Sequence, residues 1–135
     1  MEFAIDTKGH YDFINITPQV AQAVAASKIA NGLVLVFIPG ATAAITTMEY
    51  ESGLIKDITA TLEKIAPDNF DYAHHQRWGD HNGGAHIKAA LIGPSLTVPL
   101  EDHQLQLGAW QQIVLIDFDE TPRQRTVIIK ISPSE

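Results

Sequence analysis

The stretch that decides the fold is Gly32-Leu33-Val34-Leu35-Val36-Phe37-Ile38. It is apolar throughout and rich in valine, leucine and isoleucine, which is typical of strands buried on both faces. We therefore expect a central β-strand here. The run is also far too short to span a bilayer, so no membrane partner is expected.

Segments of helical period follow on both sides of this strand. Thr17-Pro18 predicts a helix start, with a hydroxyl at the N-cap and proline in the first helical position, and the apolar face continues to Ala30. A second strand is expected over Ala41–Met48, followed by a long helix that Pro67 closes. The apolar face of that helix comprises Leu54, Ile58, Leu62 and Ile65.

The remaining segments predict strands, a loop and a short helix. Pro67–Asp80 has no period and is expected to be a long functional loop, after which Asn82 can cap a short helix over Gly83–Ile92. Strands are expected at residues 2–6, 10–16, 95–98, 104–107, 110–119 and 123–131. The prediction is a single α+β domain over residues 1–135, with a mixed, mostly antiparallel sheet, two longer helices and one short helix.

Two features of the late strands concern packing. Trp110 is expected in the core or in a subunit interface, because a large aromatic at a strand start usually packs. Arg123 and Arg125 are expected on a solvated strand face or in salt bridges between subunits.

Composition narrows the function classes. Apolar residues make up 45% of the chain and charged residues 19%, which is ordinary for a globular domain. The chain has no cysteine, so a metal would need nitrogen and oxygen ligands. The formal charge of −7 disfavours a nucleic-acid partner. The first ten residues lack a signal pattern, so a cytoplasmic location is expected.

The run Gly79-Asp80-His81-Asn82-Gly83-Gly84-Ala85-His86-Ile87-Lys88 suggests a metal site. His81 and His86 would both approach the start of the expected short helix, with a carboxylate from Asp80 or Glu49 to complete or orient the set. Glu49 directly follows a predicted strand and is a candidate general base. The alternatives are that His81 is a solvated loop residue, that His86 packs in an interface, and that Glu49 is an exposed charge on the next helix.

The same helix start is a candidate phosphate site. Amide groups at a helix N-terminus favour anions, and lysine and hydroxyl side chains follow nearby. The alternative is a tight turn with a solvated lysine. The residues of this candidate site are Asn82, Gly83, Gly84, Lys88, Ser95 and Thr97.

Three passages give the chain a recognisable resemblance: the run Gly79–Lys88 with Gly93–Pro99, then Pro39–Ile45, and Leu107–Ile113. With them, residues 7–131 resemble the YjbQ-like family, also called secondary thiamine-phosphate synthases. The resemblance implies a homotrimer. It also implies a reaction in which hydroxymethylpyrimidine diphosphate and thiazole phosphate are joined and diphosphate leaves.

The resemblance also bears on the site residues. Many family members carry histidines where this chain has Gly40 and Gly84, whereas His74 and Glu49 fall where the family places a histidine and a glutamate. We expect a divalent ion, Zn²⁺ or Mg²⁺, held by His86 with His81 or His74. Asp80, Glu49 and Lys88 are the expected catalytic residues.

The function expected is therefore that of a metal- and/or phosphate-binding enzyme acting on a small phosphorylated metabolite. Charge stabilisation on the leaving diphosphate by a metal ion, amides and Lys88 would be its main need. The alternative is an oligomeric protein that binds a metal or a phosphometabolite without catalysis, which the absence of family histidines at Gly40 and Gly84 favours.

Overall fold

Eight strands form two antiparallel sheets in the computed structural model, which describes residues 1–134. The five-stranded sheet has the order β1-β8-β3-β5-β6, and the three-stranded sheet has the order β2-β7-β4. In the order of the chain, the strands are β1 Glu2–Thr7, β2 Asp12–Asn15, β3 Gly32–Phe37, β4 Ala43–Met48, β5 Ser95–Glu101, β6 Gln104–Leu105, β7 Gln112–Asp117 and β8 Arg123–Pro133.

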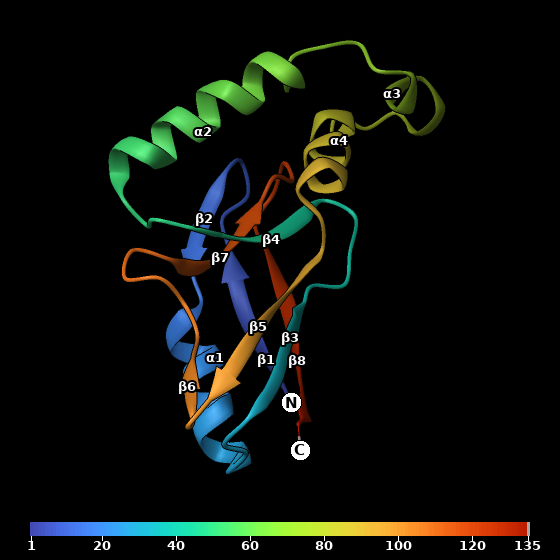
Figure 1. Cartoon of the computed structure of the whole chain (residues 1–135). Coiled ribbons are helices and arrows are strands. Elements are labelled where there is room, and N and C mark those ends of the chain that lie inside the picture. The colour runs from blue at the N-terminus through green and yellow to red at the C-terminus, as the bar shows by residue number, and fades with distance from the viewer. Residues whose placement is uncertain (135) are drawn as a thin grey trace.

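Four helices complete the fold (Figure 1). They are α1 Thr17–Ser27, α2 Ser52–Ile65, α3 Ala73–Trp78 and α4 Gly83–Ile92. Figure 1 places α2, α3 and α4 at one end of the molecule and α1 at the other. The predicted α+β fold is confirmed, although the segment expected to be a loop over residues 67–80 contains α3. None of the described helices is long and apolar enough to cross a membrane.

The three-stranded sheet is buried on both faces. One face packs with α1 and the five-stranded sheet in a cluster that includes Val20, Val36 and Ile45. The other face packs with α2 and α4 in a second cluster that includes Leu62, Ala89 and Val114. Every residue of β7 after Gln112 is buried for this reason.

The strand β3 lies at the centre of its sheet, between β8 and β5, as predicted. The expectation that it is buried on both faces is wrong. Val34 and Val36 are buried, but Leu33 and Leu35 are 52% and 37% exposed on the other face. An apolar run does not reveal that only one face of the sheet is covered, because period-two alternation is invisible when both faces carry apolar residues.

The Thr17 hydroxyl does not have the predicted role of an N-cap. Thr17 is the first residue of α1 and its hydroxyl accepts a hydrogen bond from the backbone N–H of Ile113 at 2.8 Å, so it joins the helix to β7 and does not cap it. α2 is capped by Glu51, whose carboxylate accepts from the amides of Gly53 and Leu54. α1 ends at Ser27, because Lys28 takes a left-handed conformation.

Candidate functional site

The start of α4 is packed tightly against the segment that precedes it. A Cβ on Gly83 would lie 2.8 Å from the Cβ of Tyr72, and one on Gly84 would lie 3.1 Å from the carbonyl oxygen of Pro67. The amide of Gly83 donates a hydrogen bond to Nε2 of His75 at 2.9 Å. These glycines therefore allow close packing, and one of the amides expected to bind an anion is occupied by a side chain of α3.

Lys88 does not lie at the helix start as an exposed cation. It is fully buried, and its Nζ lies 2.6 Å from Oδ1 of Asp68 and 3.7 Å from Oε2 of Glu63. It also donates to the hydroxyl of Tyr11 at 2.5 Å, and that hydroxyl donates to Glu63. Lys88 therefore joins α4 to the end of α2, with its charge already paired.

The titration of this cluster reflects its pairing. Burial, followed by the hydrogen bond to Glu63 and the charge of Asp68, raises the pKa of Tyr11 far above its usual range. Burial would also raise the pKa of Glu63, but hydrogen bonds from Tyr11 and from the backbone amide of Asp68 outweigh it, so the pKa of Glu63 is lowered. At neutral pH, Glu63 is therefore ionised and Tyr11 is neutral.

Three of the predicted site residues do come together between α3 and α4. Nδ1 of His74 lies 3.1 Å from Oδ1 of Asp80, and the rings of His74 and His86 are 4.5 Å apart between centroids. His81 faces His75 instead, with a ring separation of 5.3 Å. The partner that the structure gives His86 is therefore His74.

Burial and charge set the protonation of His86. Burial lowers the pKa of His86, and the neighbouring His74 lowers it further, against the opposing effect of Asp119 and Asp80. His86 is therefore neutral at neutral pH, with a ring nitrogen free to accept a proton or to bind a metal ion.

His86 also forms part of the wall of a pocket of about 320 Å³ between α4 and the loop that joins β3 to β4. The rest of the wall is small and apolar and comprises Gly40, Ala41, Ala43, Ala89, Ala90 and Pro94. The pocket can thus accept a small group next to an imidazole.

Other predicted residues lie elsewhere. Glu49 is exposed at the far end of β4 from Ala43, roughly 20 Å along the strand at the usual rise per residue. Ser95 and Thr97 line a separate groove of about 370 Å³ that also contains Thr47. Trp110 is 77% exposed, so it is not in the core of this chain, and the subunit-interface alternative stays a prediction.

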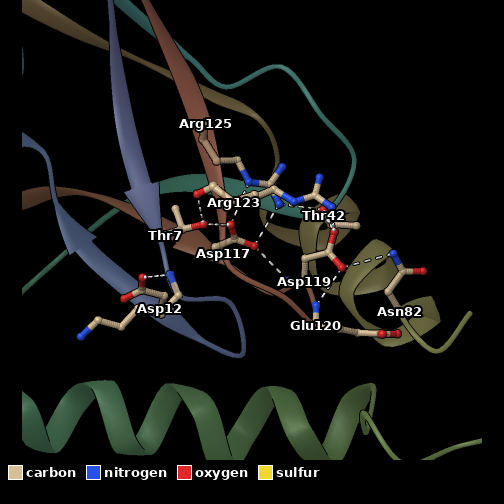
Figure 2. A network of polar contacts seen from close by, with 10 residues as sticks. Thr7, Asp12, Thr42, Asn82, Asp117, Asp119, Glu120, Arg123 and Arg125 are labelled. Carbon is tan, nitrogen blue, oxygen red and sulfur yellow. Dashed lines mark hydrogen bonds and ion pairs between the residues drawn. The ribbon is translucent and has the colours of Figure 1, made fainter.

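Figure 2 shows a polar network that includes Asp119, whose charge acts on His86. Arg125 is 5% exposed; its Nε and Nη2 bind the two carboxylate oxygens of Asp117 at 2.8 and 2.9 Å, and Nη2 also donates to the hydroxyl of Thr42 at 2.8 Å. Thr42 donates to Asp119, which also binds Arg123 at 2.8 Å. The expectation of a solvated Arg125 is therefore wrong.

Asn82 belongs to this network. Its side chain makes no capping hydrogen bond to α4; its Nδ2 donates to Oδ1 of Asp119 at 3.3 Å. Burial opposes ionisation of both aspartates, but hydrogen bonds from Arg125 and Thr7 lower the pKa of Asp117, and hydrogen bonds from the amide of Glu120 and from Thr42 lower that of Asp119. Arg125 lies two and four residues before the buried Val127 and Ile129, so all three share one face of β8. This spacing is the signal in the sequence that predicts an inward side chain.

The same geometry bears on metal binding. Across residues 1–134, no three histidine, aspartate or glutamate side chains stand ready to hold an ion. Nevertheless, Nδ1 of His74 and Oδ1 of Asp80 are buried and make no hydrogen bond despite their 3.1 Å separation. Two ligands of one ion at about 2.1 Å stand roughly 3.0–3.4 Å apart, so this pair has the spacing of two ligands.

Comparison with known proteins shows which family the chain resembles. The model of the family described as "UPF0047 protein YjbQ-like" matches residues 1–134. A UPF0047 protein of Archaeoglobus fulgidus is 42% identical over 130 residues, which cover 96% of this chain and 98% of that protein.

Solved structures agree. A crystal structure of a YjbQ/UPF0047 family protein from Clostridium acetobutylicum has a TM-score of 0.89 at 38% identity, and the match covers 98% of this chain and 99% of that one. A YbjQ-like protein from Sulfolobus solfataricus has a TM-score of 0.89 at 29% identity, covering 99% of this chain and 97% of that one. The chain belongs to the YjbQ-like UPF0047 family.

Proposed function

We propose that the protein is a metal-dependent enzyme that acts on a small phosphorylated substrate in the pocket beside His86. The observation that carries the proposal is the pair of buried, unbonded donor atoms of His74 and Asp80, 3.1 Å apart and adjacent to the His86 ring. Buried polar atoms rarely lack a partner, and an ion is a partner that nitrogen and oxygen donors accept together.

The ion would be held by His74, Asp80 and His86, completed by water or substrate. The donors are of the types that Zn²⁺ prefers, and a site with more oxygen ligands would suit Mg²⁺. The ion would supply charge stabilisation for a developing anion. His86 would have to turn toward the pair, because only two donor atoms already have ligand spacing.

The side chains have separable roles in this proposal. His86, kept neutral by burial, would bind the ion or take a proton at the pocket wall. Asp80 would hold the ion beside His74 and balance part of the ion's charge. Lys88 would position α4 through its buried pairing, and we do not assign it or Glu49 a contact with substrate.

Family membership suggests the reaction to try first. Joining hydroxymethylpyrimidine diphosphate to thiazole phosphate, with release of diphosphate, needs charge stabilisation more than a nucleophile, which suits a site with two histidines, a carboxylate and an ion. A non-catalytic protein that binds a metal or a phosphometabolite is the second candidate. The glycines at positions 40 and 84, which offer no ligand, favour it.

We also propose a cytoplasmic homotrimer. Leu33 and Leu35 are exposed on the uncovered face of the five-stranded sheet, and Trp110 is exposed in the segment that precedes β7. Exposed large apolar side chains favour a protein partner, and further copies of the chain are the simplest one. Light scattering that gives the mass of a monomer at micromolar concentration would exclude the trimer.

The test of the proposed function measures metal and turnover on the same samples. We expect bound Zn²⁺ or a Mg²⁺-dependent rate in the wild type and a loss of both in His74→Asn and His86→Asn. His103→Asn is the matched control: His103 is an exposed turn residue with φ +64°, a conformation that asparagine tolerates. Bound metal without turnover would favour the binding protein. The absence of both metal and turnover would refute the enzyme.

A further inference from the structure

The guanidinium of Arg125 keeps one nitrogen unused. Nε and Nη2 bind Asp117 and Thr42, whereas Nη1 makes no hydrogen bond with any residue in the range 1–134. A guanidinium carries five N–H donors, so the two on Nη1 remain available to an acceptor. The side chain is held rigidly by Asp117, so the free nitrogen has a fixed position.

Gly40 leaves open space in front of this nitrogen. A Cβ on Gly40 would lie 2.9 Å from Nη1 of Arg125, and no other atom beyond its chain neighbours would lie within 4 Å of it. Gly40 also has φ +121°, a conformation that other residues rarely adopt. Any side chain at position 40 would therefore approach Nη1 and fill this space.

Gly40 belongs to the wall of the pocket that contains His86, and Nη1 of Arg125 lies beside Gly40. The charged side chains that contact one another behind it are Arg123, Arg125, Asp117 and Asp119, which cancel formally. An arriving anion would thus meet a positioned N–H donor without a net negative charge in that network.

We propose that Nη1 of Arg125, reached through the gap at Gly40, binds an anionic oxygen of the ligand, either a phosphoryl or a carboxylate oxygen. The inference rests on the proposed function for the identity of the pocket and adds the residue that would bind the anionic group of the ligand. A charge-assisted N–H···O bond from a rigid guanidinium would fix the orientation of that anionic group relative to His86.

The test uses metal-free protein, so that failure of the metal site does not hide the result. Inorganic phosphate and acetate are titrated separately by calorimetry into wild type, Gly40→Ala and Gly93→Ala. Gly93 is the matched control, because its φ is +101° and a Cβ there would meet nothing within 4 Å. We expect Gly40→Ala to weaken binding at least tenfold and Gly93→Ala to leave it within about twofold.

A second measurement does not depend on any variant folding. With ¹⁵N-labelled arginine, the guanidinium resonances of Arg125 in the wild type should shift as the bound anion saturates. Which of the two anions binds identifies the oxygen as phosphoryl or carboxylate. Binding of neither anion, equal affinity in Gly40→Ala, or saturation without a shift at Arg125 would overturn the inference.

The two proposals fail separately. Anion binding that Gly40→Ala removes would support the inference even if the wild type held no metal. Metal held by His74 and His86 without anion binding would overturn the inference and leave the metal site intact.

Discussion

Lys88 and Arg125 are both buried cations, but they differ in whether hydrogen-bond donors remain unused by their protein partners. Lys88 is paired with Asp68 and Glu63, whose side chains are 36% and 41% exposed, and it also donates a hydrogen bond to Tyr11. Arg125 is paired with the fully buried Asp117 and keeps Nη1 free toward a gap. Burial alone does not assign function to a charge; the unused hydrogen-bonding capacity does.

The comparison predicts the largest loss of stability from the Arg125 pair. Asp117→Asn leaves the guanidinium buried without a counter-ion, and removing one partner of a buried pair costs about 3–5 kcal/mol. Urea unfolding followed by circular dichroism measures the change in the free energy of unfolding. Asp102→Asn, at an exposed turn, is the control and should change it little. Equal stability of Asp117→Asn and wild type would contradict the structural role of the pair.

Lys88→Met should cost less, about 1–3 kcal/mol, because water can solvate the two carboxylates left behind. The same unfolding experiment applies, with the exposed Lys56→Met as control. The variant should also keep any turnover within a few-fold of wild type. Complete loss of turnover in a folded Lys88→Met protein would restore Lys88 as a catalytic residue.

The smallest effect is the pH dependence contributed by His86. Its folded pKa is lowered from 6.5 by burial and by His74, so the unfolded chain binds the proton more readily. Stability from this group is therefore complete above pH 6.5 and falls as the pH drops below it toward the lower folded pKa. Stability curves of wild type and His86→Asn should diverge in that window.

Asp117 and Asp119 lose their stabilising effect at a lower pH than His86, so the contribution of His86 can be measured separately. Asp117 and Asp119 have lowered pKa values, so the stability that they contribute is present above their usual value of 3.8 and is lost below it as the pH falls. Parallel curves for wild type and His86→Asn between pH 5 and 7, a range of about two units around the usual histidine pKa, would show that His86 is not buried as described.

The sequence predicted the long regular elements better than the contacts between them. The α2 period, the central position of β3 and the short helix at Gly83 follow from local patterns, and they are confirmed. The pairing of Lys88 with Asp68 depends on how the end of α2 and the following segment return to α4, which no local pattern encodes. Tertiary packing also explains Gly83 and Gly84, which allow the start of α4 to pack closely against the segment before it.

Alternation of buried and exposed residues along a strand predicts burial, but it does not predict the partner of a buried side chain. Arg125 shares a face with Val127 and Ile129, so its burial could have been predicted, whereas its partner Asp117 comes from another sheet. The grouping of His74, Asp80 and His86 was expected only in part, because His81 contacts His75 of α3 instead.

The most direct test of the account is a crystal structure grown with Zn²⁺ and phosphate, with the metal located by its anomalous scattering. The account predicts an anomalous peak within bonding distance of His74 Nδ1, Asp80 Oδ1 and a nitrogen of His86, at about 2.0–2.2 Å from each. It also predicts a phosphate oxygen against Nη1 of Arg125. An anomalous peak confined to exposed histidines such as His103, with the His86 pocket empty of both ions, would contradict it.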